Sequence, residues 1–325
     1  MGRKLGRILV WTMVLLLLVA GLAAAAAELR WKRTFDAPYP DLHASTDPAV
    51  IEAGKTLVYG PAGCAYCHLP REEWDRLDAG ATPPLTGNHR FPLPFGTVYS
   101  RNLTPDAETG IGKRTDGELA RILRYGVRHD GRAAAPLMAF HGMSDEDLVA
   151  AISYLRSQPA VAAAVPEHDL NLLGKALMAF VIAPPPVGEP RPVASPPTLG
   201  PDGAPNVERG RYLVENVATC GDCHTDRNRK DGARYSGGEP MESGIDPAHF
   251  YVPPNLTPDP KTGRIYGWNE ATFLHRFRAG KTYPMGVMPW GAFGRLSDDD
   301  LRAIFRFLRT VPPVEHASGP AVVKR

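Results

Sequence analysis

One five-residue pattern occurs twice in this chain and contains all four of its cysteines. The copies are Cys64-Ala65-Tyr66-Cys67-His68 and Cys220-Gly221-Asp222-Cys223-His224. Cys-x-x-Cys-His is the pattern that attaches haem covalently to a polypeptide. Two thiols add across the two vinyl groups of haem, and the two-residue gap lets one helical turn present both sulfurs to one porphyrin edge. We therefore expect two covalently bound haem c groups, attached through Cys64, Cys67, Cys220 and Cys223.

The histidine that ends each pattern lies beside the attachment thiols, where it can reach the iron. We therefore predict His68 and His224 as the proximal iron ligands. Other cysteine chemistry fits less well. A zinc ribbon needs its two Cys-x-x-Cys pairs about 15–20 residues apart, and these pairs are far more distant. A thioredoxin-like pair needs a βαβ setting, and neither pair lies near strand-like alternation.

Length and charge narrow the functional classes. The 325 residues are enough for two domains of ordinary size. The 37 lysines and arginines nearly balance 35 aspartates and glutamates. No charge excess indicates a nucleic-acid partner or an acidic substrate.

The amino-terminal segment has the features of a membrane anchor. Arg3, Lys4 and Arg7 precede an uncharged stretch from Ile8 to Ala27. At a helical rise of about 1.5 Å per residue, this stretch reaches the thickness of a bilayer core, about 30 Å. A signal peptide would also begin with positive charge, but its apolar region is usually shorter, about 7–15 residues. We favour a retained transmembrane anchor over residues 1–28, with a cleaved signal as the alternative.

The orientation follows from the haem motifs, because c-type haem is attached on the outer side of the bacterial inner membrane. We expect a single-pass inner-membrane protein with its haem domains in the periplasm.

The two halves of the chain repeat one plan. Asn255-Leu256-Thr257-Pro258-Asp259 copies residues 102–106, and Ser297-Asp298-Asp299-Asp300-Leu301 corresponds to residues 144–148. A repeat this long indicates two copies of a domain rather than a solenoid. We predict domains over residues 29–165 and 206–325.

Apolar periodicity and capping residues predict helices in the first copy. They run from Pro48 to Tyr59, from about Asp116 to Tyr125, and to about Ser157 from an amino-terminal cap at Ser144. The segment from His68 to Ser100 is rich in Pro and Gly and is expected to be a loop around the cofactor. In each copy a glycine, Gly54 or Gly210, should allow the last helix to approach the first closely.

Residues 166–205 should connect the domains. Ala183 to Pro205 contains nine prolines, which predicts an extended, semi-rigid spacer. The apolar segment Leu170 to Ile182 before it is too short to span a membrane. We favour a helix packed between the domains over a segment on the membrane surface.

Each haem iron also needs a sixth ligand, and methionine sulfur holds ferrous iron well and raises the reduction potential. We predict Met288 for the second haem, with Met285 as the alternative. For the first haem we predict Met138. Met138-Ala139-Phe140 and Met288-Pro289-Trp290 share an aromatic residue two positions after the methionine. His129 and His141 remain alternatives at the first haem.

Further motifs accompany the two haem patterns. They are Arg33-Thr34-Phe35 with Asp47-Pro48, Phe95-Gly96-Thr97-Val98-Tyr99 leading into Asn102, and Ser-Asp-x-Asp-Leu before each final helix. With these motifs, the sequence from Lys32 to Pro312 resembles the dihaem cytochrome c subunits of membrane-bound bacterial dehydrogenases for alcohols, aldehydes and gluconate. The chain departs from the resemblance by having two haem motifs, where the subunits of the alcohol and gluconate systems usually have three. It also has Arg114 where its second copy has the expected Trp268.

The resemblance implies an all-α fold with two tandem class I cytochrome c domains after an amino-terminal transmembrane helix. It implies an electron carrier without catalytic residues of its own. Its donor would be a dehydrogenase catalytic subunit, and its acceptor a quinone, a terminal oxidase or a soluble cytochrome. The alternative is a dihaem enzyme such as a cytochrome c peroxidase or a thiosulfate dehydrogenase. A peroxidase needs one haem with a free or displaceable ligand, and a sulfur oxidiser would want a cysteine ligand beyond the four present.

Overall fold

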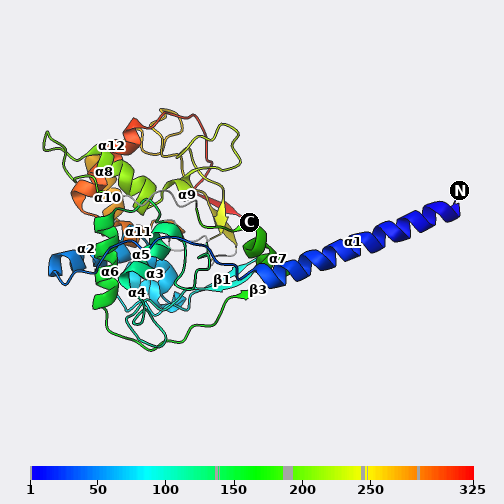
Figure 1. The fold of residues 1–325 in the computed structure, drawn as a ribbon. Helices are drawn as coiled ribbons and strands as arrows, with labels where there is room; N and C mark the ends of the chain where they lie inside the picture. Colours follow the sequence, from blue (N-terminus) through cyan, green and yellow to red (C-terminus); the bar gives the residue numbers. More distant parts are fainter. Residues whose placement is uncertain are drawn as a thin grey trace.

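The computed structural model describes residues 2–135, 138, 140–185, 193–242, 246, 248–283 and 286–325. Helix α1, Gly2–Arg30, projects from the body of the protein as one long rod (Figure 1). Its apolar side chains have almost no protein around them, and Leu16 and Leu17 are each 64% exposed. Lys4–Arg30 is long and apolar enough to cross a membrane, although a signal sequence would meet the same criterion.

Three helices around the first haem motif have the boundaries that the sequence predicts: α2 (Pro48–Tyr59), α5 (Asp116–Tyr125) and α6 (Asp145–Ser157). The motif itself forms the short helix α3 (Cys64–His68). Thr115 and Glu118 form a reciprocal capping box at the start of α5. The Ser144 hydroxyl accepts a hydrogen bond from the backbone N–H of Asp147, 3.1 Å away, at the start of α6.

The close crossing of α2 and α6 depends on Gly54. A Cβ at this position would overlap the backbone carbonyl of Ala150 and lie 3.0 Å from Cβ of Tyr154. The predicted close approach of the last helix to the first at Gly54 is confirmed. Helices α2 and α6 therefore pack backbone against backbone, and their apolar faces enclose Ile152 and Val58, both 0% exposed.

The second copy has the same arrangement. Helix α8 (Val207–Tyr212) continues as the π-helical turn η3 (Leu213–Val217). It is followed by α9 (Gly221–His224), α10 (Glu270–Arg278), α11 (Trp290–Phe293) and α12 (Asp298–Thr310). Gly210 occupies the place of Gly54, because its missing Cβ leaves room for the carbonyl of Ala303 in α12.

The prediction of an all-α fold is only partly confirmed, because the mainly helical chain also contains short strands. They are β1 (Arg90–Leu93), β2 (Gly96–Tyr99), β3 (Asp169–Leu170), β4 (Met241–Glu242), β5 (His249–Tyr251) and β6 (Val322–Lys324). Among the described residues they form two antiparallel sheets with strand orders β1-β2-β3 and β4-β5-β6. The first hairpin could not be predicted from the sequence pattern, because Pro92 and Pro94 lie in it and proline is atypical of strands. The segment expected as a loop also holds η1 (Arg71–Glu73) and α4 (Trp74–Asp78).

The apolar segment between the domains does not lie where the sequence suggested. It forms α7 (Leu172–Ala176) and the π-helical turn η2 (Leu177–Val181). These pack against the end of α1 and against β3 (Figure 1). Leu173 is 54% and Val181 is 68% exposed, so the expectation of a helix buried between the domains is wrong for this face.

The two copies of the repeat share a hydrophobic core. Its buried members come from both copies, including Met143 and Leu148 of the first and Tyr212 and Leu213 of the second. The Tyr212 hydroxyl donates to Asp147, 2.5 Å away, and accepts from the backbone N–H of Ser144, 2.9 Å away. Tyr212 thus joins the start of α6 to α8, the first helix of the second copy.

Candidate haem sites

The first haem motif is held on one short helix. Cys64 and Cys67 lie one turn apart in α3, and both are free thiols. Gly63 precedes them with φ of 64°, a left-handed conformation that favours glycine and turns the chain into α3. Burial raises the pKa of Cys64 to about 12, and the neighbouring Cys67 adds to that rise. Before haem is attached, Cys64 is therefore a neutral thiol at neutral pH.

The second motif repeats this arrangement. Cys220 precedes α9, which contains Cys223, and both are free thiols. Burial raises the pKa of Cys220 to about 12 as well. Among the described residues, no group of three or more His, Cys, Asp and Glu side chains could hold a metal ion. The motifs therefore lack the closed ligand set that a structural zinc site requires.

The imidazole ring of each motif histidine is held by a hydrogen bond to a backbone carbonyl. His68 Nδ1 lies 2.7 Å from the backbone carbonyl oxygen of Arg101, and His224 Nδ1 lies 2.9 Å from that of Pro254. A carbonyl oxygen can only accept, so Nδ1 carries the proton in both rings and Nε2 keeps its lone pair. Ligating histidines are usually fixed by such a bond on the other ring nitrogen. The two carbonyls are equivalent positions of the repeat.

The electrostatic setting of these imidazoles also suits ligation. Desolvation by burial lowers the pKa of His68 and of His224. Both rings are consequently neutral near pH 7, the form that binds metal. The residues present fit covalently bound haem c, which supplies an iron centre for one-electron transfer when attached.

Three buried donors beside the first motif were not singled out by sequence reasoning. Arg71 Nε, Trp74 Nε1 and His89 Nδ1 have no hydrogen-bond partner among the described residues. The three side chains are stacked. Arg71 Cζ lies 4.4 Å from the centroid of the Trp74 ring, and the ring centroids of Trp74 and His89 are 5.2 Å apart. Trp74 also packs edge-on against Tyr66 of the motif, with ring centroids 5.3 Å apart.

Unpaired buried donors are costly in protein interiors and call for an acceptor. The haem propionates are acids that can satisfy them, so these orphaned atoms are a second feature that fits the cofactor. Their only sequence signal is the aromatic and basic composition of a loop that directly follows the motif.

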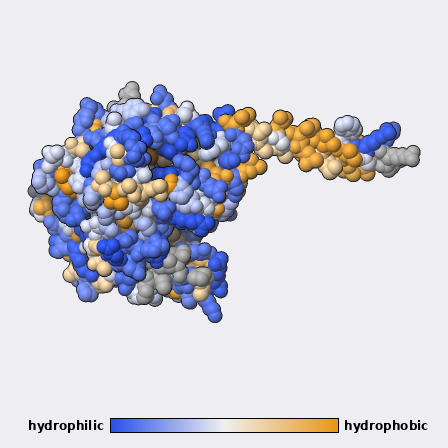
Figure 2. Space-filling model, turned by 90° about the horizontal axis from the view of Figure 1, so that it is seen from below, coloured by the Kyte–Doolittle hydropathy of each residue, from blue (hydrophilic) through white to orange (hydrophobic). Residues whose placement is uncertain are grey.

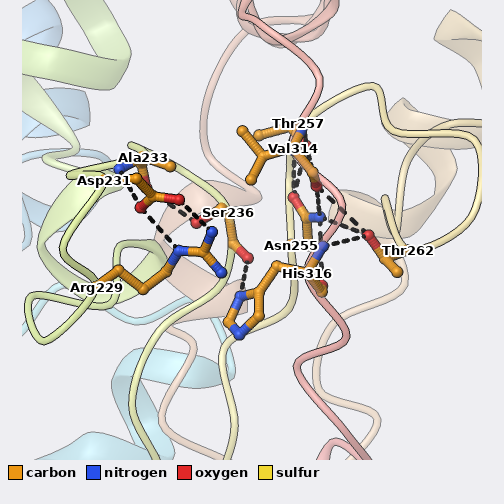
Figure 3. Close-up of polar contacts among 9 residues, drawn as sticks. All are labelled: Arg229, Asp231, Ala233, Ser236, Asn255, Thr257, Thr262, Val314 and His316. Atoms are coloured by element: carbon orange, nitrogen blue, oxygen red, sulfur yellow. Dashed lines mark hydrogen bonds and ion pairs between the residues drawn. The ribbon is translucent and has the colours of Figure 1, made fainter.

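A recurring hydrogen-bonded turn closes each site. Asn102 Nδ2 donates to Thr109 Oγ1 at 3.1 Å and to the carbonyl of Val161 at 2.9 Å. In the second copy, Asn255 Nδ2 makes the same bonds to Thr262 at 3.0 Å and to Val314 at 2.8 Å (Figure 3). Each asparagine thus fixes the loop after the motif to the segment that follows the last helix. The carbonyls of Arg101 and Pro254 come directly before these asparagines, so the turns also set the histidine partners.

Figure 3 shows a further connection in the second copy, where His316 lies beside Ser236. His316 Nδ1 is 2.8 Å from the Ser236 carbonyl oxygen. The segment after α12 is thereby bound to the loop that follows α9, and it covers that side of the second site.

The structure gives more contacts for Met288 than for Met138, the two predicted sixth ligands. Met288 is half-buried, and it packs against the same core cluster as Cys220 and Trp268. Its alternative, Met285, lies outside the described residues. Met138 is half-buried, but its neighbours Pro136, Leu137 and Ala139 lie outside the described residues.

The histidine alternatives lie in different surroundings. His141 is exposed, its Nδ1 lies 2.9 Å from the carbonyl oxygen of Arg124, and it lines a surface cavity shared with Arg211 and Asn216 of the second domain. His129 is exposed, and partial desolvation lowers its pKa. Met138 stays the predicted sixth ligand of the first haem, with His129 and His141 as its alternatives.

Comparison with known proteins agrees with this geometry. Residues 205–308 match the family model described as cytochrome c oxidase, cbb3-type, subunit III. The chain is 31% identical over 315 residues to the cytochrome c subunit of alcohol dehydrogenase (quinone) from Gluconacetobacter polyoxogenes. It is 29% identical over 269 residues to a dihaem c-type cytochrome from Cereibacter sphaeroides. The chain is a relative of these cytochromes c.

The matches cover the chain more fully than they cover the relatives. The match to the alcohol dehydrogenase subunit covers 89% of this chain but only 64% of that subunit. The chain is 29% identical to the cytochrome subunit of fructose dehydrogenase from Gluconobacter japonicus. That match covers 80% of this chain and 54% of the subunit. For the dihaem cytochrome the shares are 79% and 85%. The chain thus spans less than two thirds of the dehydrogenase subunits.

Proposed function

We propose that this chain is a membrane-anchored dihaem c-type cytochrome that receives electrons from a dehydrogenase and passes them to a quinone, a terminal oxidase or a soluble cytochrome. Its cytochrome c domains would span residues 29–165 and 206–325, with residues 166–205 between them. Both would lie in the periplasm, beside a bacterial inner membrane crossed by α1.

The observation that carries this proposal is the paired histidine geometry. His68 and His224 each direct Nδ1–H at a backbone carbonyl, and each follows a free Cys-x-x-Cys pair. The same arrangement in both repeats supports two haems rather than one. Names of relatives that refer to alcohol, fructose and gluconate dehydrogenases support a dehydrogenase as the electron donor.

The predicted ligand sets explain why electron transfer is favoured over catalysis. With His68 and Met138 at one iron, and His224 and Met288 at the other, neither iron has an open position for a substrate. A methionine ligand also raises the reduction potential, which suits acceptance of electrons from a dehydrogenase. The shared core keeps the two sites in one body, so an electron can pass between haems without domain rearrangement.

The test uses the full chain, produced in a host with haem-attachment machinery and reconstituted in lipid vesicles. Mass spectrometry should show two haem additions. After reduction by dithionite and removal of excess reductant, ubiquinone or oxidase-containing membranes should reoxidise the haem bands faster than buffer alone. Rapid turnover of hydrogen peroxide, or a colourless zinc-loaded product, would contradict the proposal.

A further inference from the structure

The end of α1 is joined to the apolar segment between the domains. Lys175 of α7 forms an ion pair with Glu28 of α1, with 2.6 Å between Nζ and Oε1. Arg33, just after α1, donates from Nη2 to the carbonyl of Ile182, 2.9 Å away, at the end of η2. Segments about 150 residues apart in the sequence thus meet where the candidate membrane span ends.

The same segment is fixed to the first haem domain. Asn171 Nδ2 donates to the carbonyl of Pro94, 3.0 Å away, in the turn between β1 and β2. Gly174 lies against the Phe95 carbonyl so closely that a Cβ would overlap it. Strand β3, directly before α7, pairs with β2 through Thr97 and Asp169. The contacts place α7 between α1 and the domain that carries the first motif.

One face of α7 and η2 remains uncovered and is apolar. Leu172 is 51%, Leu173 54%, Phe180 51% and Val181 68% exposed. The residues that face the protein are small, since Gly174 and Ala179 are buried. A helix of a soluble protein normally buries its large apolar side chains, whereas here they lie on the outer face and the small residues face the protein.

Residues at the end of α1 have the character of a membrane–water boundary. Leu29 is 89% exposed, and Trp31 follows it with Lys32 Nζ 4.8 Å and Lys175 Nζ 5.9 Å from its ring centroid. Tryptophan and basic side chains are enriched at this level of a bilayer. In Figure 2 the apolar surface of α1 continues onto the body at their junction.

We propose that α7 and η2 are a second membrane contact, whose outer face (Leu172, Leu173, Phe180 and Val181) lies in the boundary between lipid headgroups and acyl chains. The continuity of this face with α1 selects the bilayer as its occupant, since lipid must surround the place where α1 ends. The contact fixes the tilt of the first haem domain, because α7 is bonded to both α1 and the β1–β2 hairpin. This inference rests on the anchoring part of the proposed function.

The experiment measures the depth of single probes on the haem-loaded full chain. The native cysteines are consumed by haem, so one added cysteine takes an environment-sensitive fluorophore. Variants Leu173→Cys and Phe180→Cys test the outer face. Leu16→Cys in α1 is the control for insertion, and Ala271→Cys, exposed on α10 at the far side of the body from α1, is the control for water exposure (Figure 1). Each is reconstituted in phosphatidylcholine–phosphatidylglycerol vesicles with doxyl-labelled lipids.

We expect the probes at positions 173 and 180 to be quenched at least twofold by doxyl groups near the headgroup, and less by doxyl groups deep in the acyl chain. Position 16 should show the opposite depth preference, and position 271 should show no quenching. Quenching at position 16 without quenching at 173 and 180 overturns this inference and leaves the anchored cytochrome intact. No quenching at position 16 overturns both.

A second measurement tests the consequence for haem orientation. Linear dichroism of the haem bands in oriented bilayers reports the tilt of the haem planes. Leu173→Glu with Phe180→Glu should reduce this dichroism at least twofold, while Ala271→Glu leaves it unchanged. Unchanged dichroism in the double variant would show that the face does not set the orientation.

Discussion

Asp78 of the first copy of the repeat and Lys281 of the second form an ion pair, with 2.6 Å between Oδ2 and Nζ. Asp78 also accepts a hydrogen bond from the hydroxyl of Tyr66, inside the first haem motif. Lys281 begins the loop that leads to Met288. Arg295 adds a parallel connection by donating to the carbonyls of Leu77 and Ala81, 3.2 and 3.1 Å away. The first attachment helix and the proposed ligand loop of the second haem are therefore linked.

This ion pair should contribute measurably to stability. The Lys281 and Asp78 side chains are 23% and 21% exposed, so solvent screens the pair less than a surface pair. A double-mutant cycle with Asp78→Asn and Lys281→Met should give a coupling free energy of about 1–2 kcal/mol, between the ranges for exposed and buried pairs. Urea unfolding of the haem-loaded protein measures it. The exposed pair Lys113–Glu108 is the control and should give below about 0.5 kcal/mol. Equal couplings would contradict the expectation.

Each sixth ligand should be visible by near-infrared absorption, where methionine–iron charge transfer gives a band. Met288→Ala and Met138→Ala should each remove about half of this band, because each would supply one of two equivalent ligands. Met143→Leu is the control, since Met143 is 2% exposed within the core cluster. An unchanged band in Met138→Ala would mean that His141, Met143 or another residue holds the first iron.

The close helix crossing predicts a large cost for a single methyl group. Gly54→Ala forces a Cβ into the Ala150 carbonyl, so α2 and α6 must separate. We expect a loss of about 2–3 kcal/mol or more in the free energy of unfolding. Gly117→Ala, inside α5, is the matched control, because its Cβ would find its nearest neighbour 3.4 Å away. That variant should keep or gain stability, by up to about 1 kcal/mol. A Gly54→Ala protein as stable as the parent would disprove the tight crossing.

The lowered pKa of His168 should make the folded protein less stable in acid. Burial, and then the nearby Arg101, lower its pKa from 6.5 to about 4. The neutral ring is needed because Nδ1 accepts from the backbone N–H of Tyr99, 3.3 Å away. The unfolded state therefore binds this proton more readily, so stability is full above about pH 6.5 and declines as the pH falls toward 4. Replacement by His168→Gln should flatten the pH dependence of unfolding by about 2 kcal/mol across that window. Parallel curves for the two proteins would exclude His168 as the cause.

Local chemistry explains which parts of the structure could be predicted from the sequence. The Cys-x-x-Cys-His copies specify a short helix with adjacent ligand groups, and caps such as Ser144 fix helix starts within a few residues. The repeat then extends these assignments, as when Asn102 and Asn255 make the same bonds. These features depend on contacts between residues close in sequence, or on a motif that occurs in both copies of the repeat.

Other features depend on contacts that no local pattern encodes. The position of α7 follows from Lys175 meeting Glu28, and the joint between domains from Tyr212 reaching Ser144. The donors Arg71, Trp74 and His89 acquire meaning only once their buried, unpaired atoms are seen beside the motif. Composition alone could not separate them from ordinary surface residues.

The shared core has a consequence for how such a chain can change over evolutionary time. A newly duplicated domain is dispensable, because each copy still buries its own interior. Here Tyr212 of one copy satisfies the cap of α6 in the other, and Leu213 lies in the same cluster as Leu148. Loss of either copy would now leave apolar surface and a buried donor of its twin without a partner. Loss of one copy should therefore destabilise the other, so we expect selection to act on the two copies together.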